Sequence, residues 1–338
     1  MQRLATCLAV LASFPGAHAS RLEVVTTLSD YAAIAREIGG ERVHAQAIVP
    51  GHANAHFIRP KPSYALMLRR ADVFVSTGLD LELWAPVLVD KAGNRRIMDG
   101  APGSVAAAAG VELLDKPTSL SRAAGDVHIY GNPHIHTSPI LAKAIAGNIA
   151  AGLCRVDPGA CPRYREGLAR FRAEIDRRLY GETLLEFLDS ASLDPLAAQG
   201  RLPAFLEAQG LSDKLGGWLG RARSLWGRKL VCYHKNWIYL TTLLGLQVVD
   251  YVEPKPGIPP TAGHVSRLIR KIETENIEVL LAANYFEKRK PEQIAAKTGI
   301  HPVIVPLSVG GAPGADTYFD LVDLWIESLV AAWNGEGR

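Results

Sequence analysis

The sequence predicts an α/β protein of two lobes, each a parallel β-sheet flanked by helices, joined by a long rigid backbone helix. Short runs rich in Val, Ile and Leu alternate with helical stretches near the start of the chain, and the same alternation restarts at residue 229. Between the halves, apolar residues recur every three or four positions over residues 162–188, as in one long amphipathic helix. A chain of 338 residues is comfortably long for two domains.

The first 19 residues differ from the rest of the chain. Met1-Gln2-Arg3 is basic, Leu4 to Phe14 is apolar, and Ala17-His18-Ala19 fits the small-x-small rule for signal cleavage. The apolar run is too short to span a bilayer. We therefore expect an exported, periplasmic protein. Its expected parts are a signal peptide over 1–19 (cleaved after Ala19), an N-terminal α/β lobe over 20–157, a linking helix over 158–189 and a C-terminal α/β lobe over 190–338.

In the N-terminal half, β-branched runs predict strands, and the periodic stretches between them predict helices. Strands are expected at 22–27, 43–49, 72–76 and, more weakly, 111–114; helices are expected at 30–38, 62–70 and 140–153. The last of these helices has Ser138 as its N-cap and Pro139 at its first position. Residues 121–132 carry few signals of either kind, and we expect an ordered loop there.

The C-terminal half repeats the pattern after a glycine-rich region. Residues 190–225 indicate short helices joined by turns. Strands are expected at 229–233, 247–252, 279–282 and 302–305. One helix is expected to follow the first of these strands and to end at 244, and three more are expected at 261–274, 291–298 and 318–334.

The cysteines and the net charge bear on disulfide pairing and on the kind of partner to expect. In an exported protein, Cys154 and Cys161 flank a turn and a disulfide between them is plausible, although the sequence alone leaves the pairing open. Cys232 has no obvious partner, and a buried strand thiol is favoured over a metal ligand. The formal net charge of +3, without a basic tract interleaved with aromatics, gives no reason to expect a nucleic-acid partner.

Four candidate metal ligands lie where parallel strands end. His56, His134 and His234 occupy loops that follow predicted strands, and Asp316 opens the closing helix, where the helix dipole favours a carboxylate. Two come from each half, as a site in a cleft between two lobes requires. Three neutral imidazoles and one carboxylate suit zinc better than manganese, which prefers more oxygen ligands.

Other motifs are weaker. Taken singly, each of the four ligands is as readily a solvated loop residue, so the joint pattern carries the prediction. We expect His52, His128 and His136 to support the ligands or the entry of metal, without coordinating in the final site. The glycine-rich loop at 309–314 lacks the lysine and Ser/Thr of a phosphate loop. Neither a serine nucleophile elbow nor a His-Glu-x-x-His helix is present in the sequence.

These motifs resemble those of the cluster A-I solute-binding proteins of metal-transporting ABC importers, the zinc/manganese-binding family. The resemblance covers nearly all of the mature chain. It is carried by Asn54-Ala-His56-Phe with Lys61-Pro-Ser-Tyr, Gly125-Asp-Val-His128, Gly131-Asn-Pro-His134, Cys232-Tyr-His234-Lys-Asn-Trp-Ile-Tyr239 and Gly314-Ala-Asp316-Thr-Tyr318. It implies the same four ligands, His56, His134, His234 and Asp316, with the metal held between the lobes. The histidine at the third position resembles the zinc-binding branch.

The chain also departs from the family pattern. Asn54-Ala55 stands where the family has Asp-Pro, and His136-Thr137 where it commonly has Trp-Leu. The acidic, His-rich loop of many zinc-binding members is absent, and residues 185–225 resemble an insertion.

The expected function is that of a monomeric periplasmic receptor, not an enzyme. The resemblance implies that it captures a divalent metal ion, Zn2+ rather than Mn2+, and delivers it to the membrane permease of an ABC importer, with a periplasmic metallochaperone as a further potential partner. Its affinity should fall as the pH drops through the imidazole range. The alternatives are a manganese or iron receptor of the same type, an exported zinc metallohydrolase with Asp316 as general base, and a structural or adhesion protein with incidental metal.

Overall fold

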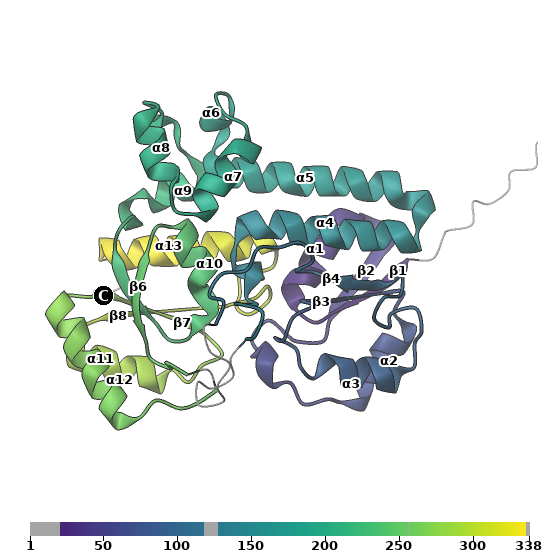
Figure 1. Ribbon diagram of the computed structural model, residues 1–338, viewed down its shortest axis with the longest axis horizontal. Coiled ribbons are helices and arrows are strands. Elements are labelled where there is room, and N and C mark those ends of the chain that lie inside the picture. Colours follow the sequence, from purple (N-terminus) through teal and green to yellow (C-terminus); the bar gives the residue numbers. More distant parts are fainter. Residues whose placement is uncertain (1–20, 118–127, 256, 336–338) are drawn as a thin grey trace, which may run out of the picture.

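The computed structural model describes residues 21–117, 128–255 and 257–335 (Figure 1). The expected signal peptide and most of the expected loop at 121–132 lie outside these residues. The described chain contains two four-stranded sheets, ordered β2-β1-β3-β4 and β6-β5-β7-β8, in which every pair of neighbouring strands is parallel. The strands are β1 (Leu22–Thr26), β2 (Val43–Ala47), β3 (Val73–Ser76), β4 (Ser104–Ala106), β5 (Lys229–Cys232), β6 (Gln247–Tyr251), β7 (Val279–Ala283) and β8 (His301–Val305). The predicted fold class is confirmed.

Helices cover both faces of each sheet (Figure 1). α2 and α3 pack on one face of the first sheet, where Leu68 and Leu88 share a buried cluster with Phe74. α11 and α12 cover one face of the second sheet through Leu268 and Ile294. The helices are α1 (Ser29–Gly39), α2 (Pro62–Arg70), α3 (Ala85–Ala92), α4 (Pro139–Val156), α5 (Cys161–Tyr180), α6 (Glu182–Leu185), α7 (Ser190–Ala198), α8 (Leu202–Ala208), α9 (Gly217–Arg221), α10 (Ile238–Leu243), α11 (Ala262–Glu275), α12 (Arg289–Thr298) and α13 (Tyr318–Asn334).

Two expectations about elements were wrong. Residues 111–114 form no strand; the fourth strand is β4, three residues around the buried Val105, which is too short to show a periodic pattern. The long helix ends at Tyr180 instead of residue 188. Gly181 has φ 77° and approaches Gly216 so closely that a Cβ would not fit, so the chain turns there. The apolar spacing of the sequence continues into α6, so the pattern did not reveal that α5 ends at Tyr180.

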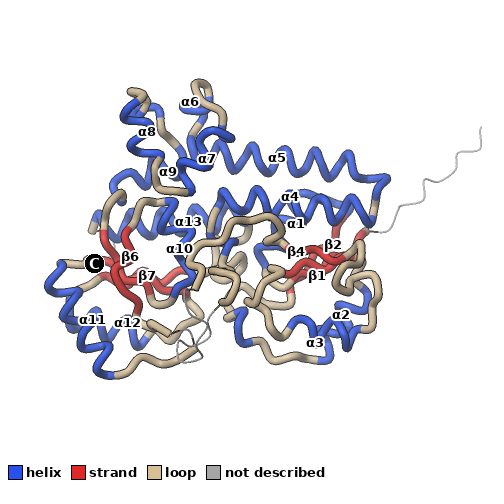
Figure 2. Tube along the Cα trace, viewed as in Figure 1, coloured by secondary structure: helices blue, strands red, loops and turns tan. Residues whose placement is uncertain are grey.

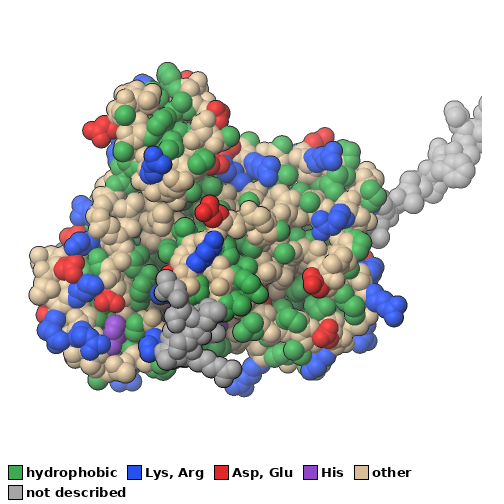
Figure 3. All heavy atoms as spheres, in the orientation of Figure 1, with side chains coloured by type: hydrophobic (Ala, Val, Ile, Leu, Met, Phe, Trp, Pro, Cys, Tyr) green, Lys and Arg blue, Asp and Glu red, His purple; other side chains and the backbone are tan. Residues whose placement is uncertain are grey.

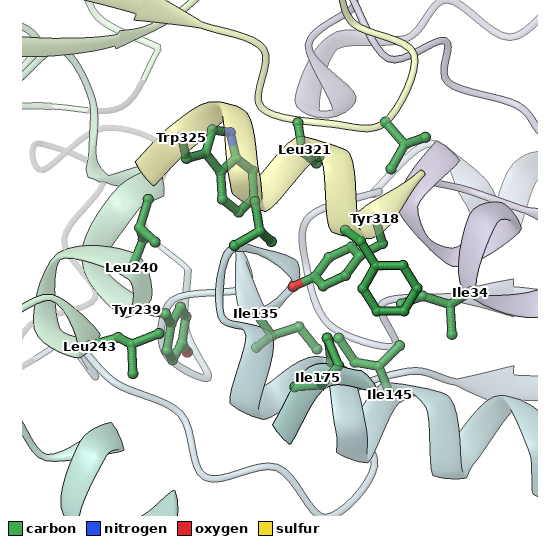
Figure 4. Close-up of a cluster of buried hydrophobic side chains, with 14 of the residues drawn as sticks. Ile34, Ile135, Ile145, Ile175, Tyr239, Leu240, Leu243, Tyr318, Leu321 and Trp325 are labelled. Atoms are coloured by element: carbon green, nitrogen blue, oxygen red, sulfur yellow. The ribbon is translucent and has the colours of Figure 1, made fainter. Parts of the chain in front are cut away.

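The two lobes share one hydrophobic core. Figure 4 shows Tyr318 and Trp325 of α13 in the same cluster as Ile34 of α1, Ile145 of α4 and Ile175 of α5. All five side chains are almost fully buried. Because residues from both halves fill one core, the loops between the sheets are held in place from both sides. Figure 2 shows these loops in tan between the red strands of the two sheets.

A disulfide joins the two helices that follow the first sheet, α4 and α5. Cys154 at the end of α4 and Cys161 at the start of α5 form a disulfide, with their Cα atoms 4.6 Å apart, so the pairing left open by the sequence is present. Cys232 is free and buried in β5, as expected of a structural strand thiol. Burial raises the pKa of this thiol.

Two surface properties bear on possible partners. By length and hydropathy α4 could cross a membrane, but 56% of it is buried inside the protein, as in a core helix. On the face seen in Figure 3, basic and acidic side chains are interspersed and do not form a patch of one sign. This agrees with the small formal net charge of +3.

Candidate metal centre

His56 lies in a short 3-10 turn, Ala55–Phe57, in the loop after β2. The Asn54 side chain caps this turn, because its Oδ1 accepts a hydrogen bond from the His56 amide at 3.0 Å. Trp84 Nε1 donates to the Ala55 carbonyl at 2.7 Å. Two side chains therefore hold the backbone that carries the imidazole.

His134 precedes the 3-10 turn Ile135–Thr137 and is buried. Asn132 Oδ1 accepts from the His134 amide at 3.1 Å and pairs with its Nδ1 at 2.9 Å. Asn132 Nδ2 donates to the Lys235 carbonyl, which belongs to the other lobe, at 2.6 Å. This network orients the amide so that Oδ1 faces the imidazole. It therefore assigns the His134 proton to Nδ1 and leaves Nε2 free to bind metal.

His234 lies two residues after the end of β5 and is also buried. β5 lies between β6 and β7, at the point where the strand order of the second sheet reverses. Ligands of parallel α/β sheets bind at such a point. The Nδ1 of His234 lies 3.3 Å from Glu253 Oε1, so a carboxylate stands beside the ring.

The structure brings these three histidines together from both lobes. One ring nitrogen from each of His56, His134 and His234 lies within 4.8 Å of the other two. The Nε2 atoms of His56 and His134 are 3.1 Å apart. Two ligands of a tetrahedral zinc ion lie about 3.3 Å apart when each bond is about 2.0 Å long. The observed separation is close to this value, so the group fits a tetrahedral metal ion.

Burial favours the neutral form of His56 and His134. Desolvation, and then the neighbouring imidazoles, lower the pKa of His56 and of His134 well below the ordinary value of 6.5. Neutral imidazole is the form that binds metal. The pH at which protons compete for these nitrogens is therefore lower than the ordinary imidazole range expected from the sequence.

Asp316, the fourth ligand expected, is not part of this group. Its side chain is exposed. Both of its neighbours in the chain are held in place: Ala315 is buried, and Thr317 forms a capping box with Asp320 at the start of α13. Asp316 thus stands between a buried residue and a half-buried helix cap. The structure therefore brings together three of the four expected ligands, and the ligand role of Asp316 stays a prediction.

The three histidines expected to support the ligands, His52, His128 and His136, differ in burial and in their distance from the group. His52 is exposed. His136 is 1% exposed, so it does not lie at an entrance, and its ring centre is 6.1 Å from that of His134. Within the described chain neither ring nitrogen of His136 has a hydrogen-bond partner, and burial lowers its pKa to about 3. His128 stands beside the three-histidine group, with its ring centre 5.0 Å from that of His56.

Two cavities reach the group. One, of about 200 Å³, is lined by Phe57, Glu253 and Phe286 together with His56 and His234, and forms an approach to the site. The other holds only about 10 Å³, close to the space for one water molecule, and is lined by His134 and His136 among others.

Sequence reasoning missed the residues that hold the ligands. Asn132, Asp80 and Glu253 each contact a histidine. Asn132 lies two residues before its histidine, whereas Asp80 and Glu253 come from other loops of the chain. A polar residue two positions before a candidate histidine was the available signal for Asn132. The other two become visible only when separate loops are folded together.

A known family of metal-binding proteins matches most of this chain. The family model described as zinc-uptake complex component A periplasmic (ZnuA) matches residues 24–179 and 215–332. The unmatched residues 180–214 overlap the segment expected to be an insertion.

Curated relatives include metal-binding proteins that align over most of the chain. The iron-binding protein YfeA of Yersinia pestis is 23% identical over 94% of this chain and 88% of its own length. The high-affinity zinc uptake system protein ZnuA of Bacillus subtilis is 21% identical over 91% of this chain and 86% of its own. A putative metal-binding protein of Treponema pallidum is 27% identical, but the match spans only 54% of that protein.

The same fold is present in solved structures. A zinc-bound ZnuA deletion mutant aligns with a TM-score of 0.68 at 23% identity, covering 93% of this chain and 98% of the other.

Proposed function

The chain belongs to the ZnuA family of metal-binding components of ABC importers, and from this premise we propose that it is an exported zinc receptor. It captures Zn2+ between its lobes, taken as residues 20–157 and 190–338 joined by 158–189, and passes the ion to a membrane permease. The mature protein begins after Ala19 and works as a monomer in the periplasm. A periplasmic metallochaperone that loads the site is a further partner in this proposal.

One observation carries the proposal. His56, His134 and His234 come from separate loops of both lobes, yet each offers a ring nitrogen within 4.8 Å of the others. Three imidazole nitrogens that converge in a largely buried place are the donor set that a transition-metal ion prefers. A divalent cation binds all three lone pairs at once.

The donor atoms favour zinc over the other metals named among the relatives. The curated relatives include zinc-, iron- and manganese-binding proteins, so membership of the family does not choose the ion. Manganese prefers carboxylate and carbonyl oxygens, whereas neutral imidazole suits zinc. The group that the described residues form contains three imidazole nitrogens.

The metallohydrolase alternative is excluded. The curated relatives include an iron-binding protein, a zinc uptake system protein and a zinc-binding lipoprotein, and none of these three is named as an enzyme.

The test is a competition titration of metal-stripped protein against a chromophoric zinc chelator. We expect one zinc per wild-type chain and a loss of at least 100-fold in affinity in His134→Ala and in His234→Ala, on the order of 2.7 kcal/mol. His44→Ala is the matched control, because His44 is exposed on β2 and pairs with Glu23. Wild-type affinity in both site variants would show that these histidines do not hold the ion.

A further inference from the structure

A further cavity, which we call the α3 cavity, lies in the N-terminal lobe. It is lined by residues of β3, the turn after β3, α3 and the segment that leads into β4; Figure 1 shows α3 on one face of this sheet. Its volume of about 560 Å³ is within the range of roughly 300–1,000 Å³ that is usual for small-molecule sites. It shares no lining residue with the two cavities that reach the histidines. The zinc site therefore does not account for it.

The walls of the α3 cavity are largely apolar. They include Phe74, Leu79, Val89, Ile97 and Met98. Phe74 and Ile97 belong to the buried cluster that α2 and α3 form against the sheet, so the core holds this part of the wall in place. Walls of this kind suit a ligand with a hydrocarbon body.

Every charged side chain that lines the α3 cavity is acidic. Glu82, Asp90 and Asp99 contribute carboxylates, and the lining contains no lysine, arginine or histidine. Asp90 and Asp99 are exposed, so they stand at the rim, whereas Glu82 is buried. The cavity is thus complementary to a cation and unfavourable for an anion.

The two carboxylate oxygens of Glu82 have different surroundings. The residue is only 3% exposed. Oε1 accepts hydrogen bonds from Thr27 Oγ1 at 2.6 Å and from the amide and Oγ1 of Thr77 at 3.1 and 2.6 Å. Within the described residues no hydrogen bond reaches Oε2. The protein therefore fixes the carboxylate through one oxygen and leaves the other for a ligand in the cavity.

This carboxylate lies at the ligand-binding position of the first sheet. Thr27 and Thr77, which hold it, directly follow β1 and β3. In the order β2-β1-β3-β4, the strand order reverses between β1 and β3. Parallel α/β sheets bind ligands beyond the carboxyl ends of their strands at such a point. Glu82 thus occupies the position in the first sheet that His234 occupies in the second.

The electrostatics of Glu82 favour an ammonium group. Burial raises the pKa of Glu82, because desolvation outweighs the hydrogen bonds from Thr27 and Thr77. A cation beside Oε2 would stabilise the ionised form that burial disfavours. A metal ion fits less well: among the described residues, only the three histidines bring three donor atoms within 4.8 Å of one another.

We propose that the α3 cavity binds a small organic ammonium ion with an apolar body. The ammonium group donates a hydrogen bond to Oε2 of Glu82, and the hydrocarbon part packs on the apolar wall. A second ammonium group at the other end of the ligand pairs with Asp90 or Asp99 at the rim. A linear diamine has this pattern. The proposal goes beyond the zinc-receptor function and does not depend on it.

The test is calorimetric titration of the purified protein with 1,6-diaminohexane near neutral pH. Hexylamine carries one charge and 1,6-hexanediol carries none, so these two probes separate charge from apolar contact. We expect one diamine per chain, weaker binding of hexylamine and no saturable binding of the diol. Glu82→Gln keeps an acceptor for Thr27 and Thr77 but removes the charge, so diamine affinity should fall about 10- to 100-fold.

Methyl NMR of methionine locates the ligand. The chain has three methionines, Met1, Met67 and Met98, and of these Met98 lines the α3 cavity. Met67 lies on α2. The diamine should shift the Met98 resonance saturably and leave the Met67 resonance in place.

The control is Asp213→Asn, because Asp213 is exposed and pairs with Lys214 outside the cavity; diamine affinity should not change. If Glu82→Gln does not fold, the double variant Asp90→Asn with Asp99→Asn carries the test, since both residues are exposed. Its affinity for the diamine should fall to that for hexylamine.

Three results would overturn the proposal: no saturable diamine binding to wild type, binding that leaves the Met98 resonance unchanged, or equal affinity for the diamine and the uncharged diol. A parallel zinc titration decides the receptor function separately, because the residues of the two sites do not overlap.

Discussion

Asn132 offers a sharp test of how the fold prepares its ligands. Its side chain makes three hydrogen bonds: two at Oδ1, from the amide and the Nδ1 of His134, and one from Nδ2 to the Lys235 carbonyl. The residue is 3% exposed. Asn132→Leu keeps the approximate size of the side chain but removes all three bonds, so His134 loses the acceptor that fixes its proton on Nδ1.

The size of the effect follows from these bonds. Groups that orient a metal-binding histidine typically change metal affinity 10- to 100-fold, which is about 1.4 to 2.7 kcal/mol. The substitution also leaves the Lys235 carbonyl and the His134 donors without their partner. Each buried unpaired group costs about 1–3 kcal/mol of folding stability. We therefore expect weaker zinc binding together with a lower unfolding midpoint.

The assay needs a control that loses stability without touching the ligands. Asn94 is 7% exposed and donates to the carbonyls of Leu68 and Ala71 at 2.9 and 2.7 Å, near the end of α2. Asn94→Leu should lower the unfolding midpoint in urea and leave zinc affinity unchanged. A folded Asn132→Leu protein that binds zinc within twofold of wild type would refute the reasoning, as would an equal loss in both variants.

Three further predictions concern stability. Burial raises the pKa of Asp30 to about 7, so folding stability should fall by about 4 kcal/mol as the pH rises from about 4 to 7 and the buried carboxyl loses its proton. Asp30→Asn should therefore be more stable than wild type in urea unfolding at pH 8. An equal pH dependence of stability in both proteins would contradict this. The disulfide between Cys154 and Cys161 closes a loop with a sequence separation of 7, so Cys154→Ser should lose about 2–3 kcal/mol, and reductant should lower the wild-type midpoint to the same level. A Cβ on Gly51 would overlap the backbone of Val309 and Gly311 from the opposite lobe, so Gly51→Ala should lower folding stability by about 1–3 kcal/mol and lower the melting temperature. Gly263→Ala is the control: its Cβ meets only ordinary contacts, so the melting temperature should not fall.

Much of the fold was predictable because it depends on local patterns. Alternating apolar runs and amphipathic stretches place most of the strands of both sheets near their observed positions. The errors fell where a pattern is too short or where a distant contact intervenes. β4 has only three residues. The end of α5 depends on Gly216, which lies 35 residues along the chain from Gly181 and packs against it.

The sequence by itself determined the two-lobed fold and the three histidine positions, because a residue that follows a parallel strand must lie at the carboxyl edge of its sheet. It could not determine which way a loop side chain points. Asp316 is exposed outside the three-histidine group in this structure. His128 lies beside the group because Asp80 holds it. Only the tertiary structure decides this, since the contacts that orient each side chain come from segments far apart in the chain.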